Sequence, residues 1–214
     1  PVTRFEANVP YGYHPRTLGV LPAVAATLTP GHAVVPIGGA RPVVFQAEVT
    51  NNQDAKTDGD LRLNLPAGWT AKPAAHELHF TRAGERAQFR FEVATASPGA
   101  RLYDVSAVAR IGTQEYSEGY TITRYRDLET RYLYRKAAAT VSGEEVKVPS
   151  GLKVGYVMGI GDEVPAALAQ LGADVQLLGE RELAGAQLSQ FDAIFTGTRA
   201  YAVRQDLITY NRRL

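Results

Sequence analysis

The period of the apolar residues changes once along the chain, near Gly151, and this change constrains the fold more than any other feature. Between about Leu18 and Tyr125, apolar and polar residues alternate with a period of two. After Gly151, short apolar runs alternate with stretches of helical periodicity. Successive side chains of a strand point to opposite faces, whereas a helix repeats about every 3.6 residues. The sequence therefore predicts two separately organised regions.

The first region contains short runs that each present one apolar and one polar face. They cover residues 43–49, 61–65, 87–93 and 103–110. Clusters rich in Gly, Pro, Asn and Asp separate the runs, and such residues favour turns. Strands with one buried face suit an antiparallel sheet. We expect an antiparallel β-sandwich of about seven strands.

The second region alternates strands and helices. Residues 152–158, 173–178 and 191–197 are expected strands, and helices are expected from Asp162 to Gly172, over Glu182–Gln190 and from about Leu207. This alternation predicts right-handed βαβ units and a parallel sheet. A doubly wound domain normally has about five or six strands. We therefore expect a truncated parallel βα region, of the flavodoxin-like kind.

These patterns divide the chain into four parts. We expect N-terminal strands and a linker over residues 1–39, the sandwich over 40–135, a linker over 136–150 and a partial α/β domain over 151–214. The chain starts without Met, and its last helical pattern has no Gly or Pro to end it. We expect a fragment of a longer protein.

Composition excludes several functions. The 214 residues contain no cysteine, so disulfides, thiolate metal sites and cysteine nucleophiles are excluded within them. The formal net charge of +1 argues against a nucleic-acid partner. No apolar run is long enough for a membrane span. We predict no cofactor.

The sandwich region resembles the NEW3 domain, an immunoglobulin-like module appended to carbohydrate-active enzymes such as α-galactosidases. The resemblance covers about residues 40–125. It rests on Val49–Asn52, on Leu65-Pro66-Ala67-Gly68-Trp69 after an alternating strand, on Gly84–Arg86 before Phe89–Phe91, and on Pro98-Gly99 before Leu102-Tyr103.

The second region resembles the glutamine-amidotransferase-like domain of large bacterial deacetylases related to PIG-L and LmbE, in which a NEW3-like sandwich comes first. The resemblance rests on Val154–Pro165, Phe191–Ile194 and Thr196–Tyr201. Relatives are expected to carry Tyr-Pro-His-Ile where this chain has Tyr125-Arg126-Asp127-Leu128. The resemblance implies an extracellular or periplasmic location.

The catalytic signatures that this resemblance implies are absent. The zinc deacetylase signature is His-Pro-Asp-Asp-Glu, whereas His14-Pro15 is followed here by Arg16-Thr17. The amidotransferase nucleophile is a cysteine, which this chain lacks. We therefore expect a non-catalytic accessory region whose parent enzyme carries its zinc site elsewhere. The expected partners are other domains of that parent and carbohydrate, and self-association through the incomplete α/β region stays open.

Five residues are candidates for a small-anion or nucleotide site. Gly159, Gly161 and Asp162 follow the first strand of the second region and open a helix, as in part of a dinucleotide fingerprint. Thr198 and Arg199 follow its third strand, and an arginine can hold a carboxylate or phosphate through two hydrogen bonds. The alternative is an ordinary βα turn, with Arg199 paired to Asp162 or Glu163.

Three further patterns favour structural interpretations. His76 and His79 are three apart on an expected strand, so they face opposite sides and do not share a metal ion. Trp69 follows a Pro-x-Gly turn and is expected to pack under a loop. The Tyr- and Arg-rich segment over residues 116–135 is an alternative surface for stacking on sugars or nucleic-acid bases. Against this stands a packing role for its side chains.

Overall fold

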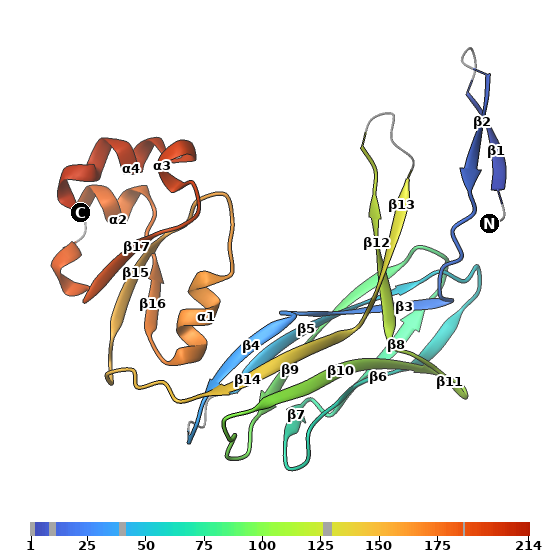
Figure 1. Ribbon diagram of the computed structural model, residues 1–214, viewed down its shortest axis with the longest axis horizontal. Helices are drawn as coiled ribbons and strands as arrows, with labels where there is room; N and C mark the ends of the chain where they lie inside the picture. Colours follow the sequence, from blue (N-terminus) through green and yellow to red (C-terminus); the bar gives the residue numbers. More distant parts are fainter. Residues whose placement is uncertain (1–2, 9–11, 39–41, 126–129, 186) are drawn as a thin grey trace. The chain divides into compact units, whose positions relative to one another are not determined.

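The computed structural model describes residues 3–8, 12–38, 42–125, 130–185 and 187–214 (Figure 1). The chain forms two compact units. Unit 1 comprises Pro1–His32, Val44–Val93 and Asp104–Thr140. Unit 2 comprises Ala33–Val43, Ala94–Tyr103 and Val141–Leu214.

Strands dominate the chain before Gly151. They are β1 (Thr3–Asn8), β2 (Gly12–Thr17), β3 (Val24–Thr29), β4 (His32–Pro36), β5 (Val43–Asn51), β6 (Thr57–Asn64), β7 (Thr70–Lys72), β8 (Ala75–Phe80), β9 (Arg86–Ala94), β10 (Leu102–Ile111), β11 (Gln114–Tyr116), β12 (Glu118–Thr123), β13 (Arg131–Lys136) and β14 (Ala138–Glu144). One sheet has the order β4-β14-β10-β6-β8, with β11 paired to β10, and another has the order β3-β5-β9-β7. The pairs β3–β5, β6–β8 and β6–β10 are antiparallel. The prediction of an antiparallel β-sandwich is confirmed.

Large apolar side chains fill the core of unit 1. Phe45, Phe80 and Phe91 are fully buried, together with Leu61 and Leu78. They come from the apolar sides of four alternating strands, because a strand places every second side chain on the same face. Trp69 is buried as well. The expected interpretation of this tryptophan as a packing residue therefore agrees with its position.

The structure differs from the sequence prediction over residues 136–150. A linker is expected there, but β14 occupies Ala138–Glu144 and joins the six-stranded sheet. Ala137, Ala139 and Val141 are buried in alternation. Small alanine side chains carry a weak hydrophobic signal, so the run does not stand out from the sequence as a strand. Pairing with distant strands decides its conformation.

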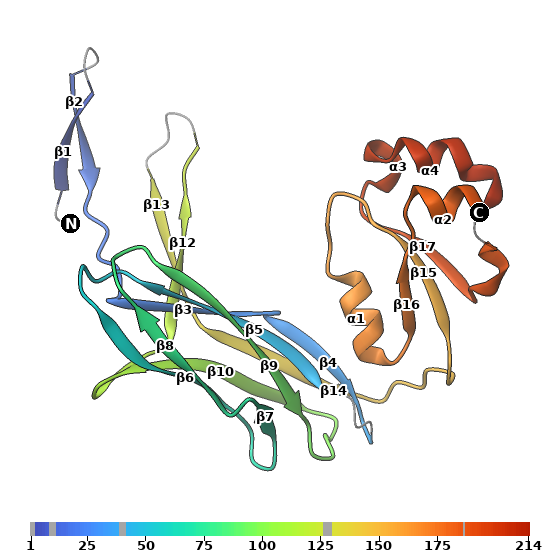
Figure 2. The same cartoon turned by 180° about the vertical axis from the view of Figure 1, so that it is seen from behind.

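Two hairpins complete unit 1. One joins β1 to β2, and the other joins β12 to β13. Figures 1 and 2 show the β12–β13 hairpin meeting β3 at its base and extending beyond the sheet. At that contact Gly119 is essential, because a Cβ there would collide with the backbone carbonyl of Ala26. The predicted departure at Tyr125–Leu128 involves residues 126–128, which lie outside the described part of the chain.

Unit 2 contains three parallel strands and short helices. The elements are β15 (Lys153–Val157), α1 (Val164–Leu171), β16 (Asp174–Leu177), α2 (Glu180–Gly185), a 3-10 turn (Leu188–Gln190), β17 (Ala193–Thr196), α3 (Ala200–Val203), α4 (Gln205–Tyr210) and a 3-10 turn (Asn211–Arg213). The strand order is β16-β15-β17, and β15 pairs in parallel with both neighbours. Figure 1 shows α1 on one side of this sheet and α2, α3 and α4 on the other.

The core of this parallel sheet is small and aliphatic. Val157, Leu178, Leu183 and Leu207 are buried together, with Leu188 and Ala200 beside them. Helix α1 ends at Gly172, whose φ of 114° suits glycine, as the sequence predicts. The helix expected over Glu182–Gln190 is instead divided between α2 and a 3-10 turn.

Among the described residues, no helix is both long and apolar enough to cross a membrane.

Candidate functional site

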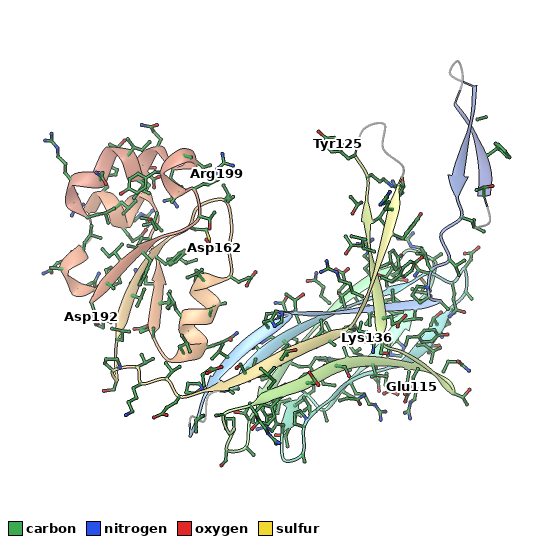
Figure 3. All side chains as sticks on the ribbon, in the orientation of Figure 1. Glu115, Tyr125, Lys136, Asp162, Asp192 and Arg199 are labelled. Carbon is green, nitrogen blue, oxygen red and sulfur yellow. The ribbon has the colours of Figure 1, made fainter. Side chains whose placement is uncertain are left out.

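Two loops meet at the carboxyl ends of β15 and β17, where close contacts bring together three of the five candidate residues, Gly159, Asp162 and Thr198. The backbone N–H of Ile160 donates to the carbonyl oxygen of Thr198 at 3.1 Å. A Cβ on Gly159 would collide with that same carbonyl, so only glycine permits this approach. Asp162 and Arg199 lie at this end of the sheet in Figure 3. The spacing therefore places these loops as predicted, at the edge where open α/β sheets bind ligands.

Hydrogen bonds of Asp162 connect the loop after β15 to the loop after β17. Its Oδ1 accepts hydrogen bonds from the Tyr156 hydroxyl at 2.8 Å and from the Val164 N–H at 3.2 Å, and its Oδ2 accepts from the Thr198 N–H at 3.2 Å. The hydroxyl of Tyr156 and these N–H groups lower the pKa of Asp162. Burial, followed by the neighbouring carboxylate, raises the pKa of Tyr156. The carboxylate thus occupies the backbone N–H groups that a bound anion would need.

Arg199 stands apart from this network. Its φ of 56° and ψ of 25° lie in the left-handed region, which is uncommon for a residue with a side chain. Within the described part of the chain its exposed side chain has no hydrogen-bond or ion-pair partner, so the expected pairing with Asp162 or Glu163 is not formed. Gly161, with a φ of 104°, faces open space. Among the five candidate residues, Arg199 therefore has a charged side chain that could bind an anion.

Arg204 is the residue that the sequence analysis missed. Its guanidinium donates to the carbonyl oxygen of Met158 at 3.2 Å and to that of Leu178 at 3.4 Å, directly after β15 and β16. It also binds the Asp206 carboxylate at 2.8 and 2.5 Å. This interaction lowers the pKa of Asp206. The Arg-x-Asp sequence at the start of a helix is the only local pattern that indicates the ion pair with Asp206. It does not predict the hydrogen bonds to the carbonyls of Met158 and Leu178.

The histidines on β8 lie on opposite faces, as predicted. The His76 ring is tilted against that of Phe89 and edge-on to that of Phe91, with ring centroids 5.0 and 4.8 Å apart. His79 is exposed and lies 2.9 Å from Asp58, whose hydrogen bond raises the pKa of His79. No group of three or more His, Cys, Asp or Glu side chains suited to a metal ion occurs among the residues that the structure describes.

The tyrosines of the β12–β13 hairpin divide between packing and exposure. The Tyr120 hydroxyl donates to Asn52 Oδ1 at 2.8 Å, and the Tyr134 hydroxyl donates to the carbonyl oxygen of Val20 at 2.7 Å. Tyr132 lies against Gly19. These contacts support the packing interpretation for three of them, whereas Tyr125 is 60% exposed.

The two sheets of antiparallel strands thus define the class of the first region as a β-sandwich. Residues 39–112 match the model of the NPCBM-associated NEW3 domain of alpha-galactosidase. The predicted NEW3 resemblance is therefore confirmed for this part of the chain. The match ends before β12 and does not extend to the parallel sheet.

Solved structures provide weaker comparisons. A FixG-related protein from Vibrio parahaemolyticus has 8% identity and a TM-score of 0.36, over 58% of this chain and 99% of that one. The E. coli chaperone DraB has 12% identity and a TM-score of 0.32, over 58% of each chain. WR4, a C. elegans MSP family member, has 6% identity and a TM-score of 0.30, over 56% of this chain and 97% of that one. No curated protein matches the chain in sequence.

Proposed function

We propose that this chain is a non-catalytic accessory region of a larger carbohydrate-active enzyme, with the sandwich as a spacer or carbohydrate-facing module. The observation that carries the proposal is the carboxyl edge of the parallel sheet. There Asp162 and Arg204 use their polar atoms on the protein's own backbone and side chains. Groups committed in this way stabilise a scaffold and are not free to act on a substrate.

The NEW3 match supports the carbohydrate part of this proposal. The name of the matched model places it with alpha-galactosidase, an enzyme that acts on a sugar. The chain also lacks cysteine, so it has no nucleophile for amidotransferase chemistry. An accessory role requires neither a nucleophile nor a metal.

The finer form of the proposal concerns the parent enzyme. On the resemblance of residues 154–165 and 191–201, the parent is a bacterial deacetylase related to PIG-L and LmbE, and the parallel strands belong to its amidotransferase-like domain. Its zinc site then lies outside these 214 residues. A His-Pro-Asp-Asp-Glu segment in the adjoining sequence is the expected finding, and its absence would contradict this form of the proposal.

Enzyme assays test both forms. The isolated chain, assayed with added Zn²⁺ on N-acetylglucosaminyl substrates, is expected to release no acetate. Deleting residues 24–144 from the parent is expected to reduce activity on a polymeric substrate and to leave activity on a soluble monosaccharide substrate within twofold. Acetate release by the isolated chain, or equal loss on both substrates, would contradict an accessory role.

A second candidate function is binding of a small anion at Arg199. The exposed, unpaired guanidinium and its left-handed backbone are the observations in its favour. Arg199→Ala is expected to abolish any rise in the melting temperature caused by phosphate or a nucleotide. Arg212→Ala, on another exposed arginine of unit 2, serves as the matched control. If neither anion raises the melting temperature of the unmodified chain, this candidate is wrong.

A further inference from the structure

A groove in unit 1 lies where the β12–β13 hairpin meets the sheet β3-β5-β9-β7. Its volume is about 680 Å³, within the range of small-molecule sites. Residues from β3, β5, β9, β12 and β13 line it. Gly119 permits the hairpin to approach β3 closely, because a side chain at that position would strike the Ala26 carbonyl. The groove therefore depends on a specific backbone contact.

The sheet side of the groove carries a row of polar side chains. Thr27 pairs with Glu48 across β3 and β5, and the Glu48 carboxylate lies 3.8 Å from the Arg86 guanidinium. Gln88, which does not line the groove, donates to the same carboxylate at 3.2 Å. Thr29 adds a second exposed hydroxyl on β3. The hydroxyl, carboxylate and guanidinium groups that line the groove can donate to and accept from the hydroxyls of a sugar ring.

The hairpin side adds positive charge that the protein does not neutralise. Arg135 stands opposite Gly119 in the hairpin register, so no acidic side chain faces it across the ladder. Lys136, labelled in Figure 3, stands opposite Glu118, yet the two form no ion pair. Among the described residues, neither cation has a hydrogen-bond or ion-pair partner. With Arg86 and Glu48, the groove contains three cations and one carboxylate, a net charge of +2.

We infer that this groove binds an acidic sugar, with the carboxylate of a uronic acid residue on Arg135 and its hydroxyls along Thr27, Thr29 and Glu48. A guanidinium with no internal partner is suited to a bidentate bond with a carboxylate. The threonine and Glu48 row supplies donors and acceptors for a ring that carries hydroxyls. The inference rests on the proposed carbohydrate-facing role of the sandwich and adds the chemical class of the ligand.

Titration of the complete chain with trigalacturonate tests the inference, with neutral galactotriose as the matched sugar. Trigalacturonate is expected to bind with a Kd of millimolar order or tighter, and galactotriose at least tenfold more weakly. Arg135→Gln is expected to weaken trigalacturonate binding at least tenfold. Arg131→Gln, on the same face of the same strand but outside the groove, is expected to change it by less than twofold. Unchanged melting temperatures of both variants show that folding is not the cause.

Several outcomes would overturn the inference. One is that trigalacturonate does not bind at millimolar concentration. Others are that galactotriose or inorganic phosphate binds as tightly as trigalacturonate. The last is that Arg131→Gln weakens trigalacturonate binding as much as Arg135→Gln does. These binding outcomes do not depend on whether the chain is catalytic. The accessory role is therefore tested separately, by measuring acetate release. Conversely, acetate release would refute the accessory role while leaving the binding data intact.

Discussion

The sandwich core of unit 1 and the parallel sheet of unit 2 use polar side chains in opposite ways. In the parallel sheet, Asp162 and Arg204 are engaged with backbone groups at the strand ends. In the sandwich unit, Arg135 and Lys136 line a groove without partners among the described residues. At the edge of the parallel sheet, Arg199 is thus the candidate side chain that has no such partner, whereas the sandwich groove contains two cations without one. Fold type alone therefore does not decide which of the two regions binds a ligand.

The two cores also differ in chemistry, and truncating one side chain in each gives the largest expected effect. Phe45→Ala is expected to destabilise the sandwich by about 3–5 kcal/mol, and Leu207→Ala the parallel sheet by about 2–5 kcal/mol, because each leaves a cavity. Chemical denaturation followed by backbone hydrogen exchange measures both losses. The controls are Phe5→Ala and Leu177→Ala, at positions 71% and 56% exposed. If the control variants lose as much stability as the core variants, Phe45 and Leu207 do not belong to the cores of the two units.

Close backbone approaches occur in both regions, and adding a methyl group at each tests them. A Cβ at Gly59 would strike the Arg110 carbonyl, and one at Gly159 would strike the Thr198 carbonyl. Each alanine variant is expected to cost about 1–3 kcal/mol, because backbone atoms cannot move aside as a flexible side chain can. Gly31→Ala and Gly185→Ala meet open space and are expected to be tolerated. If all four variants have the same melting temperature, Gly59 and Gly159 do not lie as close to the facing carbonyls as the structure shows.

The alternating pattern of the first region made its strands predictable, because burial of every second residue leaves a clear signal. Residues 43–49 follow it throughout. The β14 strand was missed, since Ala137 and Ala139 are small and their burial depends on partners distant in sequence. A period of two identifies a strand only where the buried side chains are large.

The positions of the candidate residues were predictable from the sequence, whereas their hydrogen bonds were not. Gly159, Asp162 and Thr198 were placed correctly at neighbouring loops because carboxyl ends of parallel strands share one edge. That Asp162 would bind the Thr198 N–H depends on a hydrogen bond between residues 36 positions apart, which no local pattern encodes. The same holds for Arg204 and the carbonyl of Met158.

Removing the guanidinium of Arg204 tests whether the edge of the parallel sheet is held by its own side chains. Arg204→Met keeps an apolar stem and leaves the Met158 and Leu178 carbonyls and the Asp206 carboxylate without this donor. The free energy of unfolding is expected to fall by about 1–3 kcal/mol, because these partly buried groups are left without a hydrogen-bond partner. Arg181→Met, at an exposed position of α2, is the control. If the two variants have the same denaturation midpoint, Arg204 does not stabilise the edge.

The smallest expected effect is a pH dependence of the same ion pair. Arg204 lowers the pKa of Asp206 in the folded protein, so the pair stabilises the fold above the ordinary aspartate pKa of about 3.9 and stops doing so as pH falls through the lowered value. Asp206→Asn is expected to be less stable than the unmodified chain by about 1 kcal/mol or less at pH 7. Because a protonated aspartic acid is neutral like asparagine, the difference in melting temperature between the two proteins is expected to shrink below about pH 4. A difference that stays constant or grows on acidification would mean that the ion pair contributes nothing to the stability of the parallel sheet.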